Sequence, residues 1–158
     1  MTSKFPSAGE YSSERARFAA CGVVDVRAIQ AEVNEAYRNQ VLLDVNDDCL
    51  RMAVFEGEYR WHHHPDTDEL FLVVDGELHI EFAGGEEAIL RPWQCLVVPA
   101  GVVHRTRAVG RTVNLTFERQ GGQAVFVDPP SGGSTKTALL PGDTAFQQPT
   151  RGNPDGPP

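Results

Sequence analysis

The spacing of apolar and polar residues changes near residue 40 of this 158-residue chain. Before that point, four apolar residues recur at helical spacing behind Asp25, a residue type that favours helix N-caps: Val26, Ile29, Val33 and Tyr37. The pattern predicts one short helix from residue 25 to about residue 38. Residues 1–24 show no comparable pattern and are expected to be loosely structured.

From about Gln40 onward, short apolar segments alternate with turn signals, and no helical pattern interrupts them. Asp75-Gly76 and Gly84-Gly85 are dipeptides typical of hairpin turns. Nine or ten strands are predicted, within 40–45, 50–57, 58–64, 69–75, 77–83, 86–92, 94–100, 102–109, 111–120 and 123–128. Such a series indicates an all-β sandwich or barrel. Residues 25–127, with the preceding helix, are expected to form one domain.

Residues 128–158 have a different composition, with 7 of the 11 prolines and five glycines of the chain. A segment of this kind buries little apolar surface, so we expect a Pro/Gly-rich C-terminal tail. Ala138, Leu139, Leu140 and Phe146 are the apolar residues that could dock on the barrel.

Charge and hydropathy exclude several classes of partner. The formal net charge is -8 and the isoelectric point about 5.0, so nucleic acid and anionic lipid are repelled at long range. No apolar run approaches the roughly 20 residues of a membrane-spanning helix. The N-terminus has no apolar stretch typical of a signal peptide, and a cytoplasmic location is therefore expected.

The most informative stretch is RWHHHPDTDELFLVVDG, residues 60–76. Side chains alternate between the two faces of a strand, so His62 and His64 point the same way and His63 points the other way. Glu69 begins the next predicted strand and can face the pair across the hairpin. Two imidazoles and a carboxylate can hold one face of a metal ion and leave other positions open.

A fourth candidate ligand follows a second tight turn. In PAGVVH, Pro99 and Gly101 form the turn and His104 lies on the strand that leaves it. His79, by contrast, alternates with apolar residues and shares its face with Glu77 and Glu81, so we expect it to be exposed to solvent.

Together these residues resemble the cupin superfamily of small jelly-roll barrels. The first cupin motif is matched by Gly57, His62, His64, Glu69 and Gly76, although only four residues separate Gly57 from His62. The second motif is matched by Pro99, Gly101 and His104. Trp93 and Ala108 stand where this second motif has Gly and Asn. The resemblance covers about residues 40–127 and is greatest to small single-domain cupins often labelled mannose-6-phosphate isomerase-like.

The resemblance implies an all-β jelly-roll barrel whose divalent metal ion is held by His62, His64, Glu69 and His104, and it implies a homodimer. The ion could be Fe, Mn, Ni, Co, Cu or Zn, because geometry and availability decide among them. A metal-dependent enzyme acting on a small polar molecule, such as a hydroxy acid, keto acid or enediol, is the leading hypothesis. Oxidative, dioxygenase-type chemistry is preferred over isomerase, lyase or decarboxylase chemistry.

Two alternatives stay open. The barrel could be a non-enzymatic module that binds a metal or a small ligand, or a metal-free cupin that uses acid and base residues. Strand alternation also indicates three candidate substrate-binding residues: Arg60, Asn114 and Thr116. It places Tyr59 and Trp61 on the face opposite His62.

Overall fold

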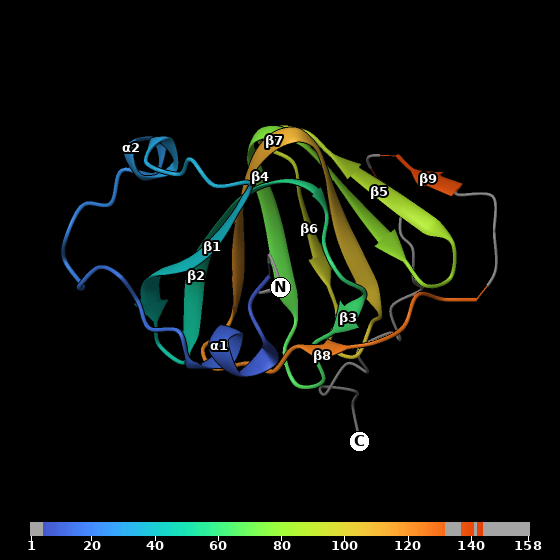
Figure 1. The fold of residues 1–158 in the computed structure, drawn as a ribbon, viewed down its shortest axis with the longest axis horizontal. Coiled ribbons are helices and arrows are strands. Elements are labelled where there is room, and N and C mark those ends of the chain that lie inside the picture. The colour runs from blue at the N-terminus through green and yellow to red at the C-terminus, as the bar shows by residue number, and fades with distance from the viewer. Residues whose placement is uncertain (1–4, 132–136, 141, 144–158) are drawn as a thin grey trace, which may run out of the picture.

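The computed structural model describes residues 5–131, 137–140 and 142–143 of the chain. Two short helices, α1 (Ala8–Ser13) and α2 (Val26–Ala31), precede the strands. The strands are β1 (Tyr37–Val45), β2 (Asp48–Glu58), β3 (His62–His63), β4 (Glu69–Phe82), β5 (Glu86–Leu90), β6 (Cys95–Val98), β7 (His104–Arg119), β8 (Val125–Phe126) and β9 (Thr137–Leu139). The all-β expectation is confirmed (Figure 1). No helix in the described ranges is long and apolar enough to span a membrane.

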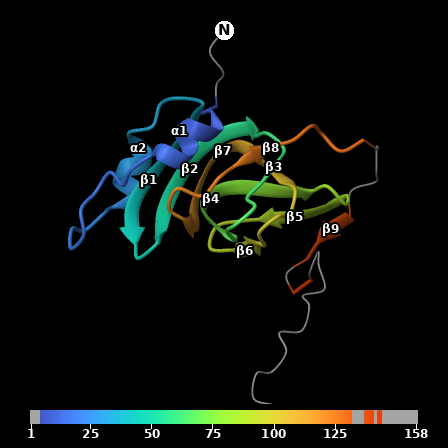
Figure 2. The same cartoon turned by 90° about the horizontal axis from the view of Figure 1, so that it is seen from below.

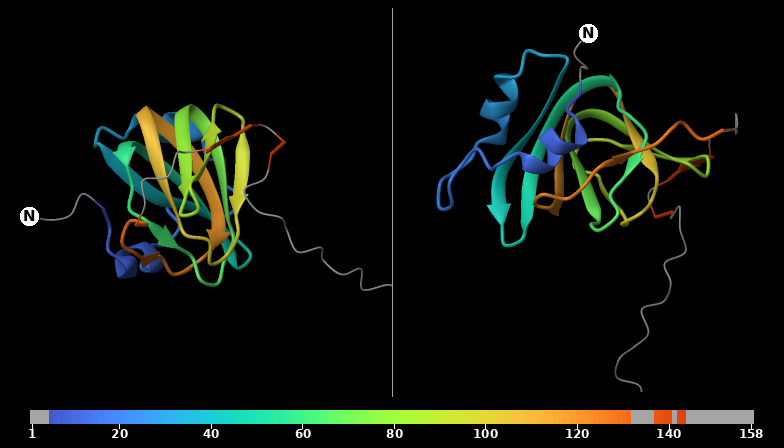
Figure 3. Two further views of the ribbon diagram at one scale, coloured as in Figure 1. Left: turned by 90° about the vertical axis from the view of Figure 1, so that its right-hand side faces the viewer. Right: turned by 60° about the horizontal axis from the view of Figure 1, so that its bottom comes forward.

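The strands form a single sheet in the order β1-β2-β7-β4-β5-β9, with β6 on β4 and β3 bridging β7 and β8. All pairs are antiparallel except β5–β9. The long strands β4 and β7 pair along most of their length and bend strongly, which curls the sheet around an interior (Figure 3). β3, β8 and α1 lie together at one end of this curled sheet (Figures 1 and 2).

Apolar side chains pack on both faces of the sheet. The interior holds a cluster that includes Phe71, Leu78, Ile80 and Phe82, all of them buried. A second cluster forms on the outer face, where Ile29 and Val33 pack against residues of β1, β2 and β7. Alternate residues of β2 therefore serve different cores, and its inward-facing set includes Arg51 as well as Ala53 and Phe55.

The predicted helix over residues 25–38 is wrong in length. Asp25 caps it as expected, with Oδ1 accepting hydrogen bonds from the backbone N–H groups of Arg27 (2.9 Å) and Ala28 (3.2 Å). The helix ends at Ala31, and Tyr37 already pairs with Phe55 as the first residue of β1. Strand pairing, which packs Tyr37 against the interior cluster, outweighs its helical spacing.

Residues expected to be loosely structured contain α1, which has a capping box. Ser7 Oγ accepts from the Glu10 N–H at 3.2 Å, and a Glu10 carboxylate oxygen accepts from the Ser7 N–H at 2.7 Å. One residue of this helix, Tyr11, is buried against the barrel. The N-terminal segment thus contributes to the end of the barrel that holds the histidines.

Two predicted turns had different outcomes. Gly84-Gly85 does join antiparallel strands, β4 and β5. Asp75-Gly76 does not: β4 runs through it, with shifts of register against β7 on either side of Asp75. Gly76 has φ of 86°, and a Cβ there would lie 2.5 Å from Thr112 Oγ1. The glycine therefore allows the close approach of two paired strands rather than a chain reversal.

Part of the tail docks on the barrel. β9 (Thr137–Leu139) adds a parallel strand to β5, and Leu139 packs against the interior cluster. Leu140 stays exposed. Phe146, the other apolar residue expected to dock, lies outside the described residues.

Candidate metal centre

The four predicted ligand residues meet at the end of the barrel that α1 covers. Strand pairing sets His62 of β3 opposite His104, the first residue of β7. Glu69 begins β4, and His64 lies in the connection that leads to it. All four side chains are buried, with no residue more than 5% exposed. The chain thus brings together the residues that the motif spacing singled out.

Each of the three imidazoles is oriented by a backbone carbonyl at its Nδ1 atom. The bonds run from His62 to the carbonyl of Arg60 (2.9 Å), from His64 to that of Gln123 (2.8 Å), and from His104 to that of Val102 (3.0 Å). A carbonyl oxygen only accepts, so each Nδ1 carries a hydrogen and the neutral imidazole presents a lone pair at Nε2. This is the arrangement that orients histidines for metal binding.

The Nε2 atoms converge on one carboxylate. His64 Nε2 lies 3.2 Å and His104 Nε2 lies 3.5 Å from Glu69 Oε2. One donor atom each from His62, Glu69 and His104 lies within 4.8 Å of the others. His64 Nε2, His104 Nε2 and Glu69 Oε2 are buried without a hydrogen-bond partner. Electron-rich atoms gathered in this way fit a divalent cation.

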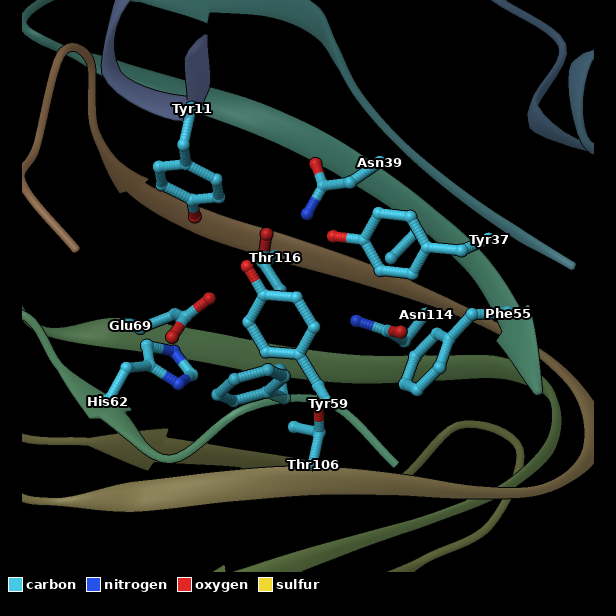
Figure 4. Close-up of a pocket in the computed structure, with 12 residues that line it drawn as sticks. Tyr11, Tyr37, Asn39, Phe55, Tyr59, His62, Glu69, Thr106, Asn114 and Thr116 are labelled. Carbon is cyan, nitrogen blue, oxygen red and sulfur yellow. The ribbon is translucent and has the colours of Figure 1, made fainter. Parts of the chain in front are cut away.

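A pocket opens beside this cluster, with His62 and Glu69 at one end (Figure 4). The space not filled by atoms measures about 380 Å³, including the part open to solvent. Its walls are largely aromatic, formed by Tyr11, Tyr37, Phe55, Tyr59 and Phe71, while Asn39, Thr106, Asn114 and Thr116 supply polar groups. Asn114 and Thr116, both predicted from strand alternation, line the pocket.

Known proteins are similar to this chain in both sequence and fold. A family model described as the cupin domain matches residues 51–117. The uncharacterized protein YdbB of Bacillus subtilis is 50% identical over 101 residues, which are 64% of this chain and 89% of YdbB. The chain belongs to the cupin superfamily.

Solved structures agree. A cupin-2 domain containing protein from Shewanella frigidimarina superposes with a TM-score of 0.58 at 30% identity, over 61% of this chain and 94% of that one. A Klebsiella pneumoniae protein with a double-stranded β-helix domain has a TM-score of 0.59 at 19% identity, over 73% of this chain and 98% of that one. The second likeness concerns the fold alone. The expected cupin jelly roll is confirmed.

Both departures from the second cupin motif have a structural outcome. Trp93, in the place of the motif's glycine, has φ of 70° and an exposed side chain. The turn is thus kept in the left-handed region, where a non-glycine residue costs about 1–2 kcal/mol. Ala108, in the place of the motif's asparagine, is buried in the interior cluster, so this position offers the pocket no polar group.

In the metal-free protein, a proton on one histidine balances the negative charge of Glu69. Burial, together with neighbouring His104, lowers the pKa of His62 to about 3. Burial also disfavours the charged form of His64, but Glu69 and Glu118 outweigh it and raise its pKa to about 9. Burial raises the pKa of the Glu69 carboxyl, yet His104 and His64 hold it well below its usual range. The metal-free site therefore pairs the Glu69 carboxylate with an imidazolium at His64.

Glu118 is a second buried carboxylate that sequence reasoning missed. Its Oε1 accepts a hydrogen bond from the Tyr11 hydroxyl (2.6 Å) and pairs with Arg51 Nε (2.8 Å). Its Oε2 has no hydrogen-bond partner and lies 3.9 Å from His64 Nε2. Burial and the charge of Glu69 raise the pKa of Glu118 to about 7. Glu118 shares strand parity with the predicted Thr116, so one more step of alternation identifies it.

Three sequence predictions about side chains near the site are wrong. Arg60 does not enter the pocket: it donates to the Pro6 carbonyl and lies 3.4 Å above the centre of the Phe126 ring. Tyr59 lines the pocket instead of facing away, because the chain leaves regular strand geometry between β2 and β3. His79 is only 8% exposed, since side chains of the flanking strands β5 and β7 cover it.

Proposed function

We propose that this cupin is a metal-dependent enzyme that acts on a small polar molecule, with one divalent transition-metal ion held by His62, His64, Glu69 and His104. The supporting observation is the convergence of histidine Nε2 atoms on one carboxylate oxygen in a buried site, where a divalent cation would replace the proton that His64 carries in the metal-free protein. Buried polar groups without partners are rare in proteins and call for an explanation, for which a cation is sufficient.

Such an ion would supply Lewis acidity and, for a redox-active metal, electron transfer to or from oxygen. Four protein ligands would leave other positions on the ion open to a substrate. Oxidative, dioxygenase-type chemistry is our first choice, ahead of isomerase, lyase or decarboxylase chemistry. The preference rests on the donor set. Three imidazoles and one carboxylate suit iron, manganese, nickel or copper as well as zinc, and oxidative chemistry needs a redox-active ion.

The chain's own residues would bind and orient the substrate. The aromatic walls enclose the end of the pocket where His62 and Glu69 lie and would limit the access of water to it. Asn114 and Thr116 of β7 place a carbonyl oxygen and a hydroxyl in the same pocket. These polar groups would fix the orientation of a substrate that the aromatic rings only enclose.

The decisive experiment measures turnover of a panel of hydroxy acids, keto acids, diols and hydroxyketones by the metal-loaded protein, in air and without oxygen. We expect consumption of at least one compound, lost in His64→Ala, with oxygen uptake if the chemistry is oxidative. Absence of turnover for every compound, under both atmospheres and with each of the candidate metals, would contradict the enzymatic function.

A non-enzymatic role for the same centre is the second candidate. It is favoured by the burial of all four ligands and by the N-terminal segment, whose Tyr11 packs at the site. A bound ion without an exchangeable water, in a protein that unfolds on chelation, would support it. We also propose that the protein is a homodimer, which light scattering coupled to gel filtration tests directly.

A further inference from the structure

The walls of the pocket carry no cationic side chain. None of the twelve lining residues is Lys or Arg, and Glu69 is the charged group among them. Enzymes that bind free carboxylates or phosphates usually present an Arg or Lys to them. A pocket without either group has nothing but the metal to attract an anion.

The two arginines nearest the site are committed to other partners. Arg51 donates to the Tyr11 carbonyl (2.7 Å), to Glu14 (2.9 Å) and to Asn39 (3.3 Å), besides its pair with Glu118. Its side chain is 2% exposed. A buried guanidinium with these four partners is held outside the pocket, whose lining does not include it.

Arg60 is equally committed. Its guanidinium donates to the Pro6 carbonyl and lies over the ring of Phe126. Turning it into the pocket would break both contacts, and Tyr59 rather than Arg60 occupies the pocket wall.

The charged side chains around the centre balance a divalent ion without help from a ligand. Glu69, Glu118 and Glu14 supply three negative charges, the last from a side chain that is 33% exposed, and Arg51 supplies one positive charge. A divalent ion beside Glu118 would favour its ionised form. The two negative charges that remain cancel those of one divalent ion. A ligand that arrives as an anion would add an unbalanced charge to a site shielded from water, which is costly.

We propose that the site selects an uncharged compound that bears hydroxyl or carbonyl oxygens, and discriminates against carboxylates and phosphates of the same size. The inference rests on the proposed metal centre and narrows its substrate class to diols, hydroxyketones and their relatives. Two buried atoms in the pocket, Asn114 Oδ1 and Thr116 Oγ1, have no hydrogen-bond partner, and a ligand hydroxyl satisfies such groups without bringing charge.

The test uses ligand pairs that differ in charge but hardly in shape. Lactamide is compared with lactate, and salicylamide with salicylate, by calorimetric titration of the full chain loaded with zinc, which supports no oxidation. Hydroxyacetone and catechol extend the uncharged set. We expect the uncharged member of each pair to bind at least about tenfold more tightly.

Equal or tighter binding of lactate and salicylate would overturn the inference, whether or not the protein turns any compound over. Failure of every uncharged compound to bind more tightly than about 10 mM would overturn it as well. If the preference holds but no compound is consumed in the turnover panel, only the enzymatic function fails.

A variant tests whether the negative charge at the centre is what weakens the binding of anions. Comparing a charged with an uncharged ligand in the same variant separates this effect from any change in zinc affinity. Glu118→Gln removes one negative charge while keeping the size of the side chain and a hydrogen-bonding oxygen for Tyr11. We expect this change to tighten lactate binding by about tenfold and to leave lactamide binding within about twofold. Unchanged lactate affinity in a folded, zinc-loaded variant would contradict the role assigned to the charge balance.

Discussion

The barrel has two buried clusters of histidine and glutamate, one on each face of the same strands. In the inner cluster, Glu69 faces histidine nitrogens and no arginine. In the outer cluster, His79 contacts Glu77 (2.8 Å) and Glu87 (2.9 Å). Arginines reach the outer carboxylates: Arg107 pairs with Glu87 (3.0 Å) and Glu81 (3.1 Å), Arg105 with Glu81 (2.7 Å), and Arg91 with Glu77 (3.2 Å).

The difference lies in where the positive charge comes from. The outer cluster obtains it from the chain, so its carboxylates are satisfied by the fold itself. The inner cluster has the guanidinium of Arg51 only at its edge, beside Glu118, and otherwise depends on a proton at His64. The same residue types therefore form a structural ion-pair network on one face and a site that calls for a cation on the other.

Glu118→Ala should give the largest loss of stability, because it leaves Arg51 buried with one partner fewer. Breaking a buried pair from one side costs about 3–5 kcal/mol. Denaturant unfolding of the variant and the parent protein measures the change. A loss below about 1 kcal/mol would show that Glu14, Asn39 and the Tyr11 carbonyl are together sufficient for Arg51.

The metal-free protein should lose stability as the pH rises. The pKa of His64 is raised from 6.5 to about 9, so the stabilisation that its proton provides is complete below about pH 6.5 and disappears through about pH 9. The pKa of Glu118 is raised from 4.5 to about 7, so the loss of its proton also lowers the stability of the folded protein, but at lower pH. The His64 contribution amounts to no more than about 3–4 kcal/mol.

Unfolding curves recorded with a chelator between pH 6 and 9.5 test this dependence. The metal-loaded protein should lack the loss, because a ligating imidazole has already given up its Nε2 proton. A metal-free protein whose stability does not change over this interval would contradict the assignment of a proton to His64.

Removal of the metal should destabilise the protein, and the size of this effect should depend on the ligands of the inner cluster and not on the residues of the outer cluster. An ion present at 100 times its dissociation constant stabilises the fold by about 2.7 kcal/mol. For a chain of this length, that corresponds to a fall in Tm of about 5–10 °C on chelation. The fall should persist in His79→Ala and vanish in His104→Ala. A chelator effect that depends on His79 would place the ion on the wrong face.

The smallest effect is expected for Glu77→Ala in the outer cluster. The Glu77 side chain is 31% exposed and its pair with Arg91 is largely solvated. Such pairs contribute about 0.2–1 kcal/mol. Denaturant unfolding should show a change within that range, and a loss of several kcal/mol would mean that the outer cluster is as dependent on each charge as the inner one.

Local spacing was sufficient to predict which residues gather at the candidate site. Alternation placed His62 and His64 together, and it also placed Asn114 and Thr116 in the pocket, because this part of β7 pairs with β2 without a shift of register. It failed at Tyr59, where the chain is not a strand, and at His79, which is covered by Glu87 and Arg107 of the neighbouring strands.

Contacts across the chain could not be predicted in the same way. Tyr11 reaches Glu118 from 107 positions away, and no local pattern marks a six-residue helix as part of the pocket. The helix at residues 25–38 was overextended for a related reason, since the pairing of Tyr37 with Phe55 lies outside any window of periodicity. The Asp75-Gly76 turn failed because the glycine serves strand packing against Thr112.

Metal content is the most direct test of the inner cluster as a cation site. It is measured by elemental mass spectrometry on protein purified without a histidine tag, alongside His104→Ala and His79→Ala. We predict about one equivalent of a transition metal in the parent protein and in His79→Ala, and background levels in His104→Ala. Background metal in the parent protein, even after anaerobic reconstitution with each candidate ion, would contradict the account.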